Sequence, residues 1–229
     1  MKVSVLMPVY NEKKTIMDVL DLVRAVEMDK EIVIVDDCSE DGTRDILRKH
    51  FPENTAEAKV FYHEKNMGKG AALRTALGMA SGEYVIVQDA DLEYSPHDIL
   101  KLVKEARVKN ADAVYGSRFL LTRKSTSLIH FCINNFLTQT SNLLFGGGLT
   151  DMETCYKLIR TSLLRELDIK ANCFEFEPEV TAKLLKRGVK ILEVPVSYRG
   201  RSYDEGKKIT WKDGIEAFIT IIRLKFTLK

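Results

Sequence analysis

Short apolar runs alternate with amphipathic stretches along the first half of the chain. The apolar runs are rich in valine and isoleucine and have few polar interruptions, which is typical of buried parallel strands. These runs are Val3–Val9, Glu31–Val35, Lys59–Tyr62, Tyr84–Val87 and Ala113–Tyr115. The stretches between them have helical periodicity and cover Thr15–Glu27, Thr43–His50, Ala71–Ala80 and Pro96–Val108. The alternation predicts an α/β fold with one mostly parallel sheet and helices on both faces.

The pattern changes after Gly116. A long helical stretch, Thr126–Phe145, ends in three consecutive glycines, and a strand-like run follows at Lys190–Tyr198. The last segment, Trp211–Lys229, has apolar residues spaced as on one helix face, namely Trp211, Ile215, Phe218, Ile219, Ile222 and Phe226. Basic residues accompany this face, so the predicted amphipathic helix suits the surface of an anionic membrane. A helix that covers the sheet or meets another subunit is the alternative.

Composition and charge limit the possible classes of protein. Hydrophobic residues at 45% and charged residues at 30% are typical of a soluble globular protein with a core. The net charge of +2 leaves no surplus of lysine and arginine for a dedicated nucleic-acid-binding protein. The four cysteines have neither CxxC nor zinc-site spacing, as expected for reduced thiols. The first residues lack a signal-peptide pattern and no run reaches the roughly 18 apolar residues of a membrane span. We therefore expect a cytoplasmic protein whose membrane contact, if any, is peripheral on the cytoplasmic face.

Carboxylates follow two of the predicted strands. Asp36 and Asp37 follow one, and Asp89, Asp91 and Glu93 follow another. The carboxyl ends of parallel strands meet at the edge of a sheet where ligands bind. Because two carboxylates about 4 Å apart repel each other by roughly 4 kcal/mol, such a cluster requires a cation. Carboxylate oxygens suit Mg²⁺ or Mn²⁺, so we predict a metal site at Asp89, Asp91 and Glu93. A solvated acidic turn before the helix that begins at Pro96 is the alternative, above all for Glu93.

Two common phosphate-binding loops are absent from the sequence. A Walker A loop requires Ser or Thr after Gly-Lys, but Gly68-Lys69 is followed by Gly70. The same stretch lacks the third glycine of a dinucleotide-binding loop and follows the third predicted strand, not the first. A bound nucleotide would therefore be held through the metal. No histidine receives a role from the sequence.

Seven motifs, in this order along the chain, resemble those of family 2 glycosyltransferases, and most closely those of the polyprenol-phosphate (dolichol-phosphate) mannosyl- and glucosyltransferases. They are PVYNE (8–12), VDDCSEDGT (35–43), NMGKGAALRTA (66–76), QDADLEY (88–94), GSRF (116–119), TDMETCYK (150–157) and VPVSYRGRSYDEGKKITWKDG (194–214). The resemblance implies a GT-A fold, with a single Rossmann-like sheet in a catalytic domain at 1–210. Within it, 1–116 is the nucleotide-binding part and 117–210 the acceptor-side part, and 211–229 is the C-terminal amphipathic helix.

The activity implied by the resemblance is inverting transfer of a sugar from a nucleotide-diphospho-sugar donor, of the GDP-mannose or UDP-glucose type. The implied cofactor is Mg²⁺ or Mn²⁺, and the implied acceptor is a polyprenyl (dolichyl) phosphate. A saccharide or protein acceptor is the alternative. Since no membrane-spanning run is present in the sequence, a homo-oligomer or a separate membrane partner is also compatible with the chain.

The resemblance also assigns roles to individual residues. It implies that the base and ribose are bound by Pro8, Tyr10, Glu12 and Asp37, and that Lys69 lies near the nucleotide. Asp89 and Asp91 flank the metal and the diphosphate, and Asp91 counts with Asp151 as catalytic. The basic residues expected to meet donor or acceptor phosphates are Arg118, Arg201 and Lys208.

Asp151 follows the triple glycine and resembles the family aspartate that faces the sugar and the acceptor. Its role is either that of a general base or that of an electrostatic positioning group, because a phosphate acceptor is already ionised near neutral pH. Glu153 is a rival for the same role. Cys155 stands where a glycine is usual, which is a departure from the family pattern.

Overall fold

The structure of the chain is a computed structural model that describes residues 1–56, 58–120, 128–201, 206, 208 and 210–227. One seven-stranded sheet forms its centre, with the strand order β3-β2-β1-β4-β6-β5-β7. The strands are β1 (Val3–Val9), β2 (Lys30–Asp36), β3 (Ala58–Tyr62), β4 (Tyr84–Val87), β5 (Ala113–Ser117), β6 (Lys157–Arg160) and β7 (Ile191–Pro195). The predicted α/β class and mostly parallel sheet are confirmed, since only β6 pairs antiparallel with its neighbours.

β6 was not predicted from the sequence. Its sequence, KLIR, has four residues with a charge at each end, so the apolar run is only two residues long. In the fold β6 fills the space between β4 and β5 and joins the first four strands to the last two. Strands from before and after residue 116 therefore form one sheet. The division of the chain at residue 116 into nucleotide-binding and acceptor-side parts stays a prediction about function.

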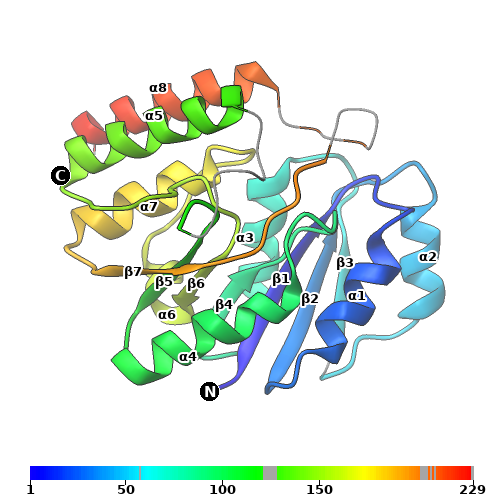
Figure 1. Cartoon of the computed structure of the whole chain (residues 1–229). Helices are drawn as coiled ribbons and strands as arrows, with labels where there is room; N and C mark the ends of the chain where they lie inside the picture. The colour runs from blue at the N-terminus through cyan, green and yellow to red at the C-terminus, as the bar shows by residue number, and fades with distance from the viewer. Residues whose placement is uncertain (57, 121–127, 202–205, 207, 209, 228–229) are drawn as a thin grey trace.

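Helices cover both faces of the sheet. They are α1 (Ile16–Ala25), α2 (Thr43–His50), α3 (Lys69–Met79), the 3₁₀ turn η1 (Pro96–Asp98), α4 (Ile99–Lys109), α5 (Leu128–Phe145), α6 (Thr161–Glu166), α7 (Phe176–Lys186) and α8 (Trp211–Thr227). In Figure 1, α1 and α4 lie in front of the sheet, and α3 packs on β1 and β2 from behind. The four helices predicted between the first five strands are all present, whereas α6 and α7 were not predicted.

The two long helices α5 and α8 lie side by side above α7 (Figure 1). Positions 126, 127, 228 and 229 of the two predicted helices lie outside the described residues. α8 buries Ala217, Thr220, Ile221 and Leu224 against the rest of the molecule. The apolar face predicted for α8 is therefore not the face that it buries, because Trp211, Ile215, Ile219 and Phe226 are exposed. No helix in the described part of the chain is both long enough and apolar enough to cross a bilayer.

Candidate active site

A cavity of about 890 Å³ opens at the carboxyl ends of β1, β2 and β4 and continues beneath α5 and α8. Eleven of the predicted site residues line it, namely Pro8, Tyr10, Glu12, Asp37, Lys69, Asp89, Asp91, Glu93, Arg118, Arg201 and Lys208. Glu153 lines it as well, but Asp151 does not. Residues that are nearly two hundred positions apart in the sequence thus share one cavity.

Strand register explains why the acidic segments meet. β1 pairs in parallel with β2 and with β4, so that Val9 lies opposite Asp36 and Leu6 lies opposite Val87. The segments that follow these strands leave the same edge of the sheet, as in other open parallel sheets. The prediction that the two acidic segments share one edge is confirmed.

Asp37 is held by backbone amides and by a histidine. Its oxygens accept hydrogen bonds from the backbone N–H groups of Met67 (2.9 Å) and Gly68 (2.7 Å), at the start of α3. The ring of His63 lies between Asp37 and Thr75, with Nδ1 2.7 Å from Asp37 Oδ1 and Nε2 3.0 Å from Thr75 Oγ1. His63 received no role in the sequence analysis, although it follows β3, the neighbour of β2, and the parallel register places it near Asp37.

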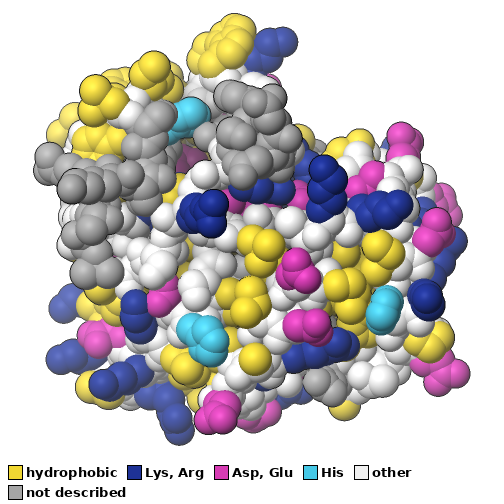
Figure 2. Space-filling model, turned by 45° about the vertical axis from the view of Figure 1, so that its right-hand side comes forward, with side chains coloured by type: hydrophobic (Ala, Val, Ile, Leu, Met, Phe, Trp, Pro, Cys, Tyr) yellow, Lys and Arg dark blue, Asp and Glu magenta, His cyan; other side chains and the backbone are white. Residues whose placement is uncertain are grey.

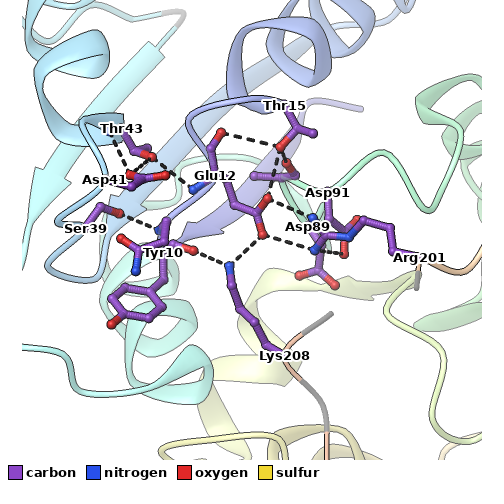
Figure 3. Close-up of polar contacts among 12 residues, drawn as sticks. Tyr10, Glu12, Thr15, Ser39, Asp41, Thr43, Asp89, Asp91, Arg201 and Lys208 are labelled. Carbon is purple, nitrogen blue, oxygen red and sulfur yellow. Dashed lines mark hydrogen bonds and ion pairs between the residues drawn. The ribbon is translucent and has the colours of Figure 1, made fainter. Parts of the chain in front are cut away.

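The carboxylates of the cavity are paired with basic side chains of the same chain (Figure 3). Arg201 bonds both Glu12 oxygens, at 3.0 and 3.1 Å, and lies 3.4 Å from Asp91. Lys208 lies 2.6 Å from Glu12 Oε1 and also donates to the Tyr10 carbonyl oxygen. The predicted basic and acidic residues are therefore brought together, with Arg201 and Lys208 directed at the acidic residues.

Lys69 connects the strand-end carboxylates to α7. Its Nζ atom lies 2.9 Å from Asp89 Oδ2 and 3.2 Å from Glu177 Oε1. Burial alone would lower the pKa of Lys69, but the charges of Asp89 and Glu177 raise it well above its usual value. Lys69 is therefore a fixed positive charge beside Asp89.

Glu93 differs from the two aspartates before it. Its Oε1 accepts a hydrogen bond from the Arg201 backbone N–H (2.7 Å), and its Oε2 accepts one from the Tyr198 hydroxyl (2.8 Å). Its carbonyl oxygen accepts a further one from the Arg199 N–H (2.8 Å). Glu93 thus connects residues 198–201 to the end of Asp89-Ala90-Asp91, here called the DxD segment, and both of its carboxylate oxygens already accept hydrogen bonds.

Asp89 and Asp91 have the chemistry of a divalent-cation site. Burial raises the pKa of Asp91 to about 7, the charges of Asp89 and Glu93 add to the rise, and Arg201 opposes it. A divalent cation would relieve this repulsion through oxygen ligands of the kind that it prefers. In the described ranges, no three or more His, Cys, Asp or Glu side chains lie together as a ready-made metal site. The two aspartates fit a cation that keeps other positions for a ligand.

Asp151 lies beneath the cavity with 0% of its surface exposed. Its Oδ2 accepts hydrogen bonds from the backbone N–H (2.9 Å) and Nε (2.7 Å) of Arg118, and its Oδ1 accepts one from Arg118 Nη2 (2.7 Å). Arg118 in turn lies over the rings of Phe119 and Tyr198 and borders the cavity. In this arrangement Asp151 orients Arg118 and has no oxygen directed at the cavity.

A mixed sheet with an Asp-x-Asp pair at a strand end, facing a cavity, is the arrangement of the GT-A class of glycosyltransferases. The chain belongs to glycosyl transferase family 2, whose model matches residues 4–168. It is 30% identical over 219 residues to an uncharacterized protein of Methanocaldococcus jannaschii, covering 89% of this chain and 93% of that one. It is 27% identical over 218 residues to an undecaprenyl-phosphate mannosyltransferase of Micrococcus luteus, covering 90% and 87%.

Among solved structures, the chain is similar to glucosyl-3-phosphoglycerate synthase of Mycobacterium tuberculosis in complex with Mn²⁺, uridine diphosphate and phosphoglyceric acid. The TM-score is 0.71 at 21% identity, over 98% of this chain and 78% of that one. This likeness confirms the GT-A fold predicted from the sequence.

Proposed function

We propose that the protein is a metal-dependent, inverting glycosyltransferase that moves a hexose from a nucleotide diphosphate to a polyprenyl phosphate. The observation that carries the proposal is the two-sided character of the cavity. One wall holds Asp89, Asp91 and their basic partners, while the other comes from α5 and α8 and is mostly apolar, with His130, Asn134 and Asp213 as its polar members. A charged donor and an acceptor with a hydrocarbon chain would each find a matching wall.

On the donor side, Asp89 and Asp91 would hold Mg²⁺ or Mn²⁺, and the ion would neutralise charge on the diphosphate. Glu93 would act through the segment that it anchors. Pro8, Tyr10, Glu12 and Asp37 would contact the nucleoside, since they line the cavity beside the DxD segment. The likeness to an enzyme solved with Mn²⁺ and uridine diphosphate supports this proposal.

The transfer itself forms one bond and breaks one. An oxygen of the acceptor phosphate bonds to the anomeric carbon while the bond from that carbon to the diphosphate oxygen breaks, with inversion at the carbon. Negative charge then develops on the departing diphosphate, and preorganised cations lower the energy of that state. Lys69, Arg201 and Lys208 are cations that line the cavity, and each already bonds one of its carboxylates.

The apolar wall supports a lipid acceptor. Ile129, Ile133, Trp211 and Ala217 line the cavity on this side, and Arg118 provides a positive charge at its inner end. The Arg118 guanidinium, which Asp151 orients, is a positive charge that suits a phosphate, and the apolar wall suits the isoprenoid units next to it. The relative named undecaprenyl-phosphate mannosyltransferase supports the same acceptor class.

The apolar wall continues onto the outer surface, which supports peripheral contact with a membrane. The exposed apolar side chains of α5 and α8, here called the apolar layer, are Leu128, Ile129, Ile133, Phe136, Leu143, Trp211, Ile215, Ile219 and Phe226. Ile129, Ile133 and Trp211 belong to both the layer and the lining of the cavity. Hydrophobic side chains also gather at the top of the molecule in Figure 2, the end at which α5 and α8 lie in Figure 1. An exposed apolar patch of this kind next to a cavity is typical of an interaction surface.

The test is transfer from GDP-mannose, UDP-glucose or UDP-N-acetylglucosamine to a polyprenyl phosphate in detergent with Mn²⁺. The expected product is extracted into organic solvent and releases its sugar in mild acid. Asp91→Asn is expected to abolish transfer while the protein stays folded, because the residue lies in a strand-end loop. Transfer only to a saccharide or protein hydroxyl would overturn the acceptor, and full activity of Asp91→Asn or activity without a divalent cation would overturn the metal site.

A further inference from the structure

Glu153 presents an unsatisfied carboxyl group to the cavity. The residue lines the cavity, and its Oε1 atom is buried without a hydrogen-bond partner among the described residues. Asp151, two positions earlier, differs in both respects, because it lies outside the cavity and Arg118 bonds both of its oxygens. Of these two acidic residues, only Glu153 has an oxygen left for a ligand.

Charged groups from four parts of the fold face Glu153. They are Glu177 on α7, Lys157 on β6, Arg118 after β5, and Asp151 in the preceding loop. Burial and then the charge of Glu177 raise the pKa of Glu153 to about 7, while Lys157 and Arg118 oppose the rise. The two basic side chains already bond other groups: Lys157 donates to the Thr154 carbonyl oxygen, and Arg118 donates to Asp151. Glu153 therefore lies among charges but has no donor of its own.

A buried oxygen without a partner costs about 1–3 kcal/mol, and an ionised carboxylate can only accept hydrogen bonds. The missing partner must therefore bring a proton. A dianionic acceptor phosphate has none on its attacking oxygen, and neither has the donor diphosphate when it is bound to a metal. The base N–H groups and ribose hydroxyls also donate, but the proposed function assigns the nucleoside to Pro8, Tyr10 and Asp37. Within the proposed reaction, the hydroxyl groups of the transferred hexose are then the donors left for Glu153.

We propose that Glu153 binds a hydroxyl group of the hexose and so selects the sugar of the donor, while Asp151 acts only by positioning Arg118. This inference rests on the glycosyl transfer proposed above. A buried group that hydrogen-bonds a substrate hydroxyl rejects the analogue that lacks this hydroxyl, because the group is then left unpaired. Glu153 is therefore a determinant of which hexose the enzyme transfers.

The experiment compares wild type, Glu153→Ala and Glu153→Gln by measuring dissociation constants. The probes are whichever of GDP-mannose, UDP-glucose and UDP-N-acetylglucosamine the wild type binds most tightly, the single-deoxy analogues of that donor, and its nucleoside diphosphate alone. We expect Glu153→Ala to weaken binding of the parent donor about 10-fold or more, as for a hydrogen bond to a charged group. For the deoxy analogue that lacks the hydroxyl bound by Glu153, wild type and Glu153→Ala should bind with equal affinity. The nucleoside diphosphate alone should bind equally to all three proteins. Glu179→Gln is the control, because Glu179 is a buried glutamate of α7 that lies outside the cavity.

The pH dependence gives a second readout. A hydroxyl that donates to Glu153 favours the ionised carboxylate, so the binding advantage of the sugar over the bare diphosphate should fall as the pH drops below about 7. In Glu153→Gln this dependence should be absent.

Two outcomes would overturn the inference. One is an equal penalty for every deoxy analogue and for the bare diphosphate, and the other is no penalty at all. Binding is measured without an acceptor, so failure of transfer to polyprenyl phosphate would overturn the acceptor assignment and leave this result intact. A wild type that binds no nucleotide sugar would overturn both.

Discussion

Arg118 and Asp151 form the most enclosed ion pair of the site. Their side chains are 8% and 0% exposed. Burial alone would lower the pKa of Arg118, but the Asp151 charge raises it well above its usual value. Two buried charges in contact depend on each other, since removing one leaves the other unpaired in a medium of low dielectric. The pair therefore links stability with the geometry of the cavity.

We predict that Arg118→Ala lowers the free energy of unfolding by about 3–5 kcal/mol, because it leaves the Asp151 carboxylate buried alone. Urea denaturation measures this change. In a double-mutant cycle, the loss in Arg118→Ala/Asp151→Asn should be clearly smaller than the sum of the two single losses. Additive losses would show that the two side chains act independently.

The sequence predicted most residues of the site, and it did so through motifs at strand ends. It did not predict their partners. That Arg118 engages Asp151, that Arg201 reaches Glu12, or that His63 braces Asp37 depends on distances that close only in the folded chain. Residue type and order along the chain indicate which groups share a site, whereas tertiary packing decides which of them remain open to a ligand.

Glu31 is a buried carboxylate at the opposite end of β2 from the site. Burial alone would raise its pKa, but hydrogen bonds from Ser4, the Ser81 backbone, Lys59 and the Ser81 hydroxyl lower it to about 2. We predict that the contribution of Glu31 to the free energy of unfolding is constant above about pH 4.5. It should fall by on the order of 2–3 kcal/mol as the pH drops from 4.5 towards 2. Urea unfolding at several pH values tests this, and Glu31→Gln should flatten this part of the curve.

At the scale of elements, the start of α3 shows how a turn shapes the site. Gly68 has φ +91°, and a Cβ atom placed on it would lie 2.4 Å from the Asn172 carbonyl oxygen. Glycine therefore lets residues 171–172 approach α3, while the Gly68 N–H reaches Asp37. Gly78, near the other end of the same helix, has nothing within 4 Å of such a Cβ.

These two glycines give opposite predictions. Gly68→Ala should destabilise the protein by about 1–3 kcal/mol, since it combines a left-handed backbone with a backbone clash. Gly78→Ala should stabilise it by about 0.5–1 kcal/mol, since alanine favours a helix interior. Thermal unfolding of the two variants is the measurement, and a shift of the same sign in both would contradict this account of α3.

Elements were predictable where burial is regular along the chain. β1, β2, β4 and β5 are buried along nearly their whole length and are largely apolar in sequence, and the edge strand β3 is also mostly apolar although only partly buried. α7 escaped prediction because its buried face includes Glu177 and Glu179, which bond Lys69 and the backbone of residues 170–171. When charged residues on the buried face of a helix bond partners far away in the sequence, the apolar periodicity of that helix is interrupted and the sequence alone does not predict it.

At the scale of the whole molecule, the cavity lies between the carboxyl ends of the strands and the helices α5 and α8, and the apolar layer runs from the cavity lining onto the exposed surface of these helices. Exposed lysine and arginine side chains at Lys212 and Arg223 lie on the same helix, α8. Apolar side chains with basic neighbours suit the surface of an anionic bilayer, which would bring the acceptor's hydrocarbon chain to the cavity.

We predict that the protein cosediments with vesicles that contain phosphatidylglycerol, and that salt weakens this binding. Ile219→Glu should reduce partitioning at least about 10-fold, because burial of one isoleucine contributes about 1.5–3 kcal/mol. Val108→Glu is the matched control: Val108 on α4 is 68% exposed and Ile219 is 55% exposed, but only Ile219 belongs to the apolar layer. Equal loss in both variants, or a wild type that ignores such vesicles at low salt, would show that the layer does not meet lipid.

The contacts of Arg201 and Lys208 with Glu12 and Asp91 mean that the site carries its own counterions before any ligand arrives. Binding of a metal and a nucleotide diphosphate would then be an ion exchange: the cation takes over the carboxylates, and the released basic groups turn to the phosphates. The number of paired charges is about the same before and after. Screening by salt acts on both sides of such an exchange, so donor affinity should vary little with ionic strength while binding to an anionic bilayer varies strongly.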